Sequence, residues 1–137
     1  MKTNKRGFTL IELMVVITII AILSAVGMSS YKTVSKKSRD SRRKADLEQI
    51  RGALELYRAD EGEYPVSLPD CGDPLASGTT TYMEQIPCDP TERTDYGYNQ
   101  DDTFRYTLLT CLEQEDALGD CGSLSCTEGN AYCIHNP

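Results

Sequence analysis

The sequence predicts an α+β fold in which one long N-terminal helix packs against a small antiparallel β-sheet head held by disulfides. Three observations support this prediction. An apolar stretch runs from Phe8 to Met28, and a proline-free segment with helical periodicity continues to Ala59. Short strand and turn patterns follow, and six cysteines lie among them. With 137 residues, the chain has room for one domain and its anchor.

Charge is divided unevenly along the chain. Residues 1–58 hold 12 Lys and Arg against 5 Asp and Glu, whereas residues 59–137 hold 2 against 16, so a net charge of +7 precedes one of −14. An acidic head whose only cations are Arg93 and Arg105 repels phosphate. We therefore expect no nucleic-acid binding by the head.

The apolar stretch Phe8–Met28 is long enough, as a helix, to cross a bilayer core of about 30 Å. Glu12 is its only charged residue. A carboxylate in such a helix costs about 2.5–3.5 kcal/mol, which suggests a partner or a functional role. The alternative is an interfacial acid that the positive end of the helix dipole favours. The stretch as a whole also allows a signal peptide cut after Gly27, which would release a soluble, disulfide-rich binding module.

Residues 5–23, KRGFTLIELMVVITIIAIL, resemble the prepilin leader and N-terminal helix of type IV pilins and of the pseudopilins of type II secretion systems. The resemblance implies that prepilin peptidase cuts between Gly7 and Phe8 at the cytoplasmic face and methylates the new amine of Phe8. It also implies assembly into a helical filament by an assembly ATPase and its platform protein.

The resemblance divides the chain into four parts. These are a leader (1–7), a transmembrane and filament-core helix (8–28), an amphipathic extension (29–59) and an extracytoplasmic acidic, disulfide-rich β head (60–137). After cleavage, the ammonium of Phe8 and the carboxylate of Glu12 would lie one helical turn apart, and a neighbouring subunit could supply the same pair in trans. Because each charge is costly to bury alone, the axial offset that pairs them is favoured.

Orientation has two conflicting signals. The positive-inside rule alone would place the C-terminus in the cytoplasm, because more cations follow the apolar stretch than precede it. The cysteines and the prepilin junction require the opposite, a single-pass inner-membrane protein whose head is extracytoplasmic and later part of an extracellular or periplasmic filament. The basic segment would then contact the acidic head of another subunit, or remain solvated near lipid head groups. Its cations are Lys32, Lys36, Lys37, Arg39, Arg42, Arg43 and Lys44.

The helix after the membrane stretch is predicted from its apolar face. Leu47, Ile50, Leu54 and Tyr57 recur at helical spacing. Upstream, the stripe continues only with small side chains, at Val34, Ser41 and Ala45. We expect the helix to end at residues 60–62 with Gly62 in a left-handed cap, before an extended Tyr64-Pro65. The passage LYRADEGEYP is similar to the helix exit of major pseudopilins, and YMEQIPCDP, more loosely, to the segment that leads into their sheet. Both favour the G-type pseudopilin branch over the larger classical pilins.

The head is predicted to contain a hairpin and a third strand. Tyr96–Asn99 and Phe104–Leu112 flank a turn signal at residues 100–103, and a short strand near Ala131–His135 completes the sheet. Phe104, Tyr106 and Leu108 are expected on one face, toward the helix.

An even number of cysteines in a loop-rich segment is typical of disulfides formed outside the cytoplasm. Free thiols and zinc are the alternatives, but no C-x-x-C pair occurs and His135 is the only histidine. We favour a bond between Cys71 and Cys88, because both flank the loop between helix and sheet, and leave the others unassigned: Cys111, Cys121, Cys126 and Cys133.

The resemblance also suggests a calcium site in the acidic loop at residues 113–120. Cysteines surround this loop, unlike the family's pattern, so disulfides could replace the ion, and a solvated loop is the simpler alternative. The candidate ligands are Glu113, Glu115, Asp116 and Asp120. We expect no other cofactor. With one histidine and no G-x-S-x-G, phosphate-loop or H-E-x-x-H motif, the sequence does not predict an enzyme.

Overall fold

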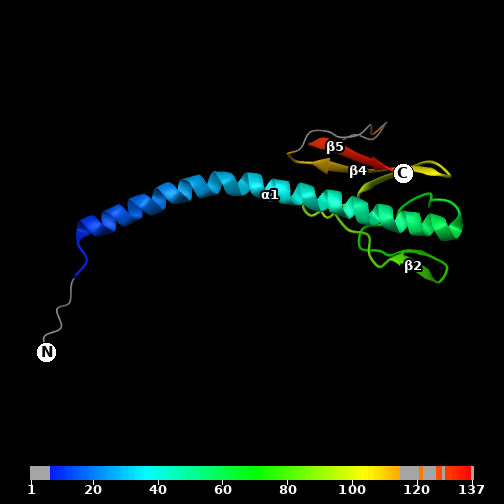
Figure 1. Cartoon of the computed structure of the whole chain (residues 1–137), viewed down its shortest axis with the longest axis horizontal. Helices are drawn as coiled ribbons and strands as arrows, with labels where there is room; N and C mark the ends of the chain where they lie inside the picture. The colour runs from blue at the N-terminus through cyan, green and yellow to red at the C-terminus, as the bar shows by residue number, and fades with distance from the viewer. Residues whose placement is uncertain (1–6, 115–120, 122–125, 128, 137) are drawn as a thin grey trace, which may run out of the picture. The chain divides into compact units, whose positions relative to one another are not determined.

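The computed structural model describes residues 7–114, 121, 126, 127 and 129–136 (Figure 1). Within these residues, one helix precedes five strands, and the predicted α+β architecture is confirmed. The elements are α1 (Leu10–Glu61), β1 (Leu75–Ser77), β2 (Thr80–Met83), β3 (Gly97–Asp102), β4 (Arg105–Leu112) and β5 (Asn130–His135). The chain divides into two compact units, residues 1–35 and 36–137.

In the first unit, α1 begins at Leu10, two residues after the predicted start at Phe8. The start is later because Thr9 is the N-cap residue, as its hydrogen bonds described below show. Described side chains from residue 7 to residue 27 are exposed. The helix contains an apolar segment that is long enough to cross a membrane. An N-terminal signal sequence can meet the same criterion of length and hydropathy.

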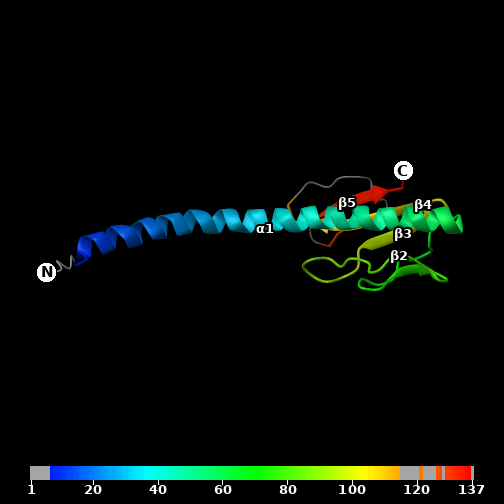
Figure 2. The same ribbon diagram turned by 60° about the horizontal axis from the view of Figure 1, so that its bottom comes forward.

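The second unit consists of the C-terminal part of α1 and two antiparallel sheets. β3, β4 and β5 form one sheet in that order, with Tyr98 opposite Leu108 and Leu109 opposite Cys133. β1 and β2 form a separate hairpin around Gly78, whose φ is 56°. Beside this part of α1, β4 and β5 lie on one side and β2 on the other (Figures 1 and 2).

The core lies between α1 and the three-stranded sheet. Leu47, Ile50 and Leu54 of α1 are fully buried, so the predicted helical face is confirmed. Tyr64 and Tyr106 meet edge to face, with ring centroids 4.6 Å apart. Tyr57, predicted on the same stripe, is only partly buried at the edge of this core.

The helix exit follows the prediction closely. α1 ends at Glu61, and Gly62 has a φ of 84° while its amide donates to the carbonyl of Arg58 at 2.9 Å. The Tyr64 hydroxyl then donates to Glu55 Oε1 at 2.8 Å. This bond ties the first residues after the helix back to its last turns.

The hairpin was predicted correctly in type, but its turn is shorter than expected. β3 continues to Asp102, which pairs with Arg105 after a register shift between Gln100 and Asp102. Phe104 therefore lies in the turn, where Asp102 Oδ1 accepts its amide at 2.8 Å, and is 56% exposed. Its predicted place on the core face beside Tyr106 was wrong, because the strand alternation begins only at Arg105.

All six cysteines are described and all are paired. The structure joins Cys71 to Cys88, the pair that we favoured from the sequence. The remaining bonds connect the region after β4 to β4 itself and to β5: Cys111–Cys126 and Cys121–Cys133. No thiolate is therefore available as a zinc ligand.

Candidate functional site

The N-terminal unit presents an exposed apolar surface. Its large side chains are each 49% to 88% exposed. A helix that is apolar on every side requires lipid or other helices around it. The side chains are Phe8, Leu10, Ile11, Leu13, Met14, Val15, Val16, Ile17, Ile19, Ile20, Ile22, Leu23 and Val26.

The proposed processing and assembly residues lie together at the start of this surface. Gly7 and Phe8 precede the helix and are both exposed, and among the described residues no atom apart from the chain neighbours lies within 4 Å of the position of a Cβ on Gly7. Glu12 Oε2 accepts the Thr9 amide at 2.8 Å and the Thr9 hydroxyl at 2.7 Å, and the Glu12 amide donates to Thr9 Oγ1 at 3.3 Å.

These reciprocal hydrogen bonds form a capping box. Sequence analysis missed the role of Thr9, although Thr9-Leu10-Ile11-Glu12 before an apolar run is the spacing that signals such a cap. Glu12 therefore has a local partner within its own chain. The geometry thus adds helix capping to the two roles that the sequence suggested for this carboxylate.

In the second unit, residues 36–137, which we call the head unit, the buried face of α1 continues from Leu47 toward the N-terminus through charged residues. Asp40, Arg43 and Asp46 are buried, whereas Ser41 and Ala45 are exposed, so the predicted small-residue stripe was wrong. The buried face continues through charges because each of them has a partner from the head. Tyr96, for example, donates to Asp46 Oδ2 at 2.7 Å.

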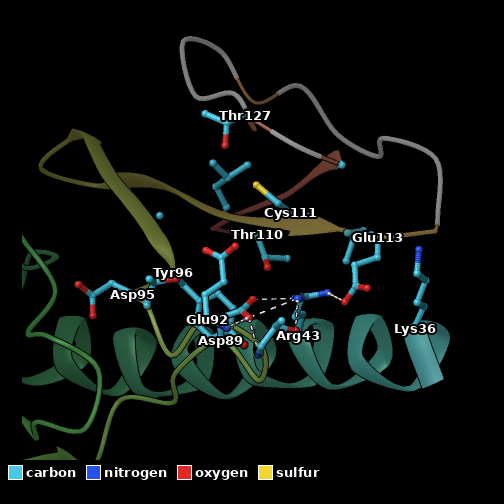
Figure 3. A pocket seen from close by; sticks show the side chains of 16 residues that line it. Lys36, Arg43, Asp89, Glu92, Asp95, Tyr96, Thr110, Cys111, Glu113 and Thr127 are labelled. Carbon is cyan, nitrogen blue, oxygen red and sulfur yellow. Dashed lines mark hydrogen bonds and ion pairs between the residues drawn. The ribbon is translucent and has the colours of Figure 1, made fainter. Parts of the chain in front are cut away.

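Arg43 is the centre of an ion cluster that consists of Arg39, Asp40, Arg43, Asp89 and Glu113 (Figure 3). Its Nε donates to Asp89 Oδ2 at 2.7 Å, and its Nη1 donates to Asp40 Oδ1 at 2.8 Å and to Glu113 Oε1 at 3.0 Å. The Arg43 side chain is 5% exposed. We call these five residues the Arg43 cluster.

Asp40 and Arg39 complete the cluster. Asp40 is fully buried, and its two oxygens accept the amides of Glu113 and Gln114, each at 2.9 Å. Arg39 donates to both oxygens of Glu113, with Nε at 2.6 Å and Nη2 at 2.5 Å. The chain just after β4 is thus bound to α1 through both its backbone and its first acidic side chain.

The cluster shifts the ionisation of its members. Hydrogen bonds from Arg39, and then from Arg43, hold the pKa of Glu113 at about 2, below its ordinary 4.5, although burial opposes the shift. Burial raises the pKa of Asp89, but the Arg43 side chain and two backbone amides outweigh it, so this pKa is also lowered. Burial likewise opposes the charge on Arg43, yet its carboxylate partners raise its pKa overall.

A cavity of about 860 Å³ borders the cluster and is lined by residues of α1, of the 89–97 segment and of β4 (Figure 3). Arg43, Asp89 and Glu113 line it and are bonded to one another. As far as the structure describes it, the lining contains no histidine and no free thiol. Because these charged groups are bonded to one another, they join segments of the head.

Two sequence hypotheses change in light of this cluster. Arg39 and Arg43 contact the acidic head of their own chain, whereas we expected the basic segment to contact another subunit or solvent. Glu113, a candidate calcium ligand, has both oxygens on guanidinium groups. Among the described residues, no group of three His, Cys, Asp or Glu could hold a metal. The other candidates lie outside those residues: Glu115, Asp116 and Asp120.

An exposed apolar helix that precedes a small disulfide-linked α+β head defines a protein of pilin-like architecture. In agreement, residues 2–28 match the family described as the prokaryotic N-terminal methylation motif. The type II secretion system core protein G of Klebsiella pneumoniae is 32% identical over 98 residues, which cover 64% of this chain and 69% of that protein. The chain belongs to the family of type IV pilins and type II secretion pseudopilins.

Other relatives cover different shares of the chain. The type II secretion system core protein G of Dickeya chrysanthemi is 27% identical over 100 residues, 66% of this chain and 65% of that protein. A fimbrial protein of Neisseria meningitidis is 37% identical over 79 residues, 58% of this chain and 45% of that protein. The matched region thus spans about two thirds of the secretion proteins and less than half of the fimbrial one. No solved structure matches the chain.

Proposed function

We propose that this chain is a structural subunit of a filament of the type IV pilus or type II secretion class, not an enzyme. The observation that supports this most is the exposed apolar surface from Phe8 to Val26, directly after a Gly7-Phe8 junction and with Glu12 near its start. In this proposal prepilin peptidase removes residues 1–7 and methylates Phe8. The apolar helix holds the subunit in the membrane until an assembly ATPase and its platform protein transfer it to the fibre.

The capping geometry supports a specific role for Glu12 in assembly. Its Oε2 caps the helix through Thr9, which leaves Oε1 as the acceptor for a charged partner. In the mature chain the Thr9 amide is still present, so processing would keep the cap. A new Phe8 ammonium from a neighbouring subunit would then complete the charge pair that a buried carboxylate requires.

Charge complementarity supports a second contact between subunits. Lys36, Lys37 and Arg42 are exposed on α1, whereas Arg39 and Arg43 are bonded to the head of their own chain. Exposed carboxylates are numerous on the head, among them Glu63 and Glu92. In a head-to-tail filament contact, the exposed cations of one copy would face the acidic head of the next.

The intact mass of the native protein, taken from membranes and from a sheared surface fraction, tests this proposal. We expect a chain that begins at Phe8 with one added methyl group and shows no mass gain when it is alkylated without prior reduction. It should be present in the sheared fraction if the filament is extracellular, or form cross-linked multimers in the cell envelope if the filament is periplasmic. A mass that begins at Met28 would instead show the signal-cleaved secreted module. A correctly processed chain that is absent from the sheared fraction and also forms no cross-linked multimers in the cell envelope would contradict the filament role.

A further inference from the structure

We propose that the guanidinium of Arg43 is the built-in cation of the head, and that it joins α1, the turn at residues 89–92 and the end of β4 without calcium. The proposal goes beyond filament assembly and does not depend on it. The resemblance suggested that calcium could organise this acidic part of the head. At Glu113, where this acidic part begins, the geometry assigns that task to a side chain.

Three carboxylates from three chain segments meet at this one guanidinium. Asp40, Asp89 and Glu113 lie 2.8, 2.7 and 3.0 Å from Arg43 nitrogens, and their side chains are 0%, 15% and 24% exposed. Carboxylates brought together at low exposure repel one another unless a cation lies between them. Arg43 supplies this positive charge where bulk solvent has little access.

Every N–H group of the Arg43 guanidinium has an acceptor. Nε and Nη2 reach the two oxygens of Asp89 at 2.7 and 3.3 Å, Nη2 also donates to the Thr91 hydroxyl at 3.1 Å, and Nη1 bridges Asp40 and Glu113. Asp89 Oδ1 in turn accepts the Thr91 and Glu92 amides at 2.7 and 3.1 Å. One planar cation thus orders a turn and a strand end on the helix.

A calcium ion at Glu113 is disfavoured by the same contacts. Calcium requires about six to eight oxygen ligands. Both Glu113 oxygens are bonded to Arg39 and Arg43, so a calcium ion there would displace these bonds and meet two positive charges. A covalently attached cation, unlike calcium, is not lost to a chelator.

The test uses the full chain in detergent micelles, with thermal unfolding followed by the near-ultraviolet circular dichroism of its tyrosines. For the wild type we expect the same Tm in excess EDTA and in millimolar calcium. Arg43→Met should lower the Tm by about 10 °C or more in both media, since one partner of a buried pair is lost. Arg42→Ala, the exposed neighbour, is the matched control and should leave the Tm unchanged.

The effect of Asp89→Asn on the Tm should have opposite signs in the wild type and in Arg43→Met if the role of Arg43 is its charge and not only its packing. Asp89→Asn keeps an oxygen for the turn amides but removes the negative charge. It should lower the Tm of the wild type, and it should raise the Tm of Arg43→Met, where that charge has lost its counter-ion. A lowered Tm in both backgrounds would overturn the proposal.

The wild-type experiment remains decisive even if Arg43→Met does not fold. A wild-type Tm that falls in EDTA and recovers in calcium would overturn the proposal, as would an Arg43→Met protein as stable as Arg42→Ala. Neither result depends on processing or filament assembly, so the proposed function could fail or hold independently.

Discussion

Acid should weaken the head through Glu113, and Glu113→Gln should remove that sensitivity. The pKa of Glu113 is about 2 in the folded chain, against an ordinary 4.5. A lowered pKa stabilises the fold fully above the ordinary value, and this contribution is lost as the pH falls from about 5 toward the folded-state pKa. The carboxylate therefore strengthens the head at neutral pH and not at pH 2.

The size of the effect follows from the shift and the exposure of the side chain. A shift from 4.5 to about 2 corresponds to about 3 kcal/mol if it is fully realised. Because Glu113 is 24% exposed, solvent screening reduces this to about 1–2 kcal/mol. We therefore expect Glu113→Gln to lower the free energy of unfolding by about 1–2 kcal/mol at pH 7.

Urea unfolding of the full chain in detergent, followed by tyrosine circular dichroism, measures this effect, because all tyrosines except Tyr31 lie in the head unit. The difference between wild type and variant should shrink to near zero between pH 5 and pH 2. Asp89, whose pKa is also lowered, is common to both proteins, so the difference isolates Glu113.

A matched control is Glu48→Gln, since Glu48 is 55% exposed and lies 3.5 Å from Arg51 on the helix surface. It should change the stability by no more than about 0.5 kcal/mol at any pH. A wild-type-to-variant difference for Glu113→Gln that stays constant from pH 7 to pH 2 would refute the assigned role of this ion pair.

Three further predictions address assembly, core and backbone. Glu12→Ala should leave leader removal intact but reduce filament yield in sheared fractions, whereas Thr9→Ala, which keeps the carboxylate, should assemble; normal yield from Glu12→Ala would contradict pairing in trans. Leu54→Ala should destabilise the head by about 2–5 kcal/mol in urea unfolding and Leu56→Ala, 59% exposed, by less than about 0.5 kcal/mol; equal losses would disprove the assigned helix face. Gly62→Ala, at a φ of 84°, should cost about 1–2 kcal/mol, and an unchanged urea midpoint would argue against the left-handed cap.

Local patterns were sufficient for most of the fold. The helix, its exit at Gly62 and the β3–β4 hairpin depend on neighbours within a few residues, so spacing and turn residues predicted them. The β1–β2 hairpin was missed, although Gly78 just before a run of strand-favouring Thr and Tyr residues was a usable signal. The exposure of Phe104 could not be predicted, because it depends on a register shift that follows from strand pairing.

The candidate sites divide in the same way. The prepilin-like junction is a linear motif, so the sequence alone was enough to propose Gly7, Phe8 and Glu12 as site residues, and it contained the Thr9 signal as well. The Arg43 cluster joins residues up to 74 positions apart, and seven similar cations between residues 32 and 44 gave no reason to select two of them.

By itself, the sequence determined the class of protein, because membrane insertion, helix period and processing are decided by consecutive residues. It also determined that the cysteines would be paired, through their number and composition. Only the tertiary structure decided which of the basic residues form ion pairs with the head of their own chain. Burial of Arg43 and Asp40 becomes favourable only when folding brings Asp89 and Glu113 to them, and the energy of an ion pair depends on distance and solvent access, which residue order does not specify.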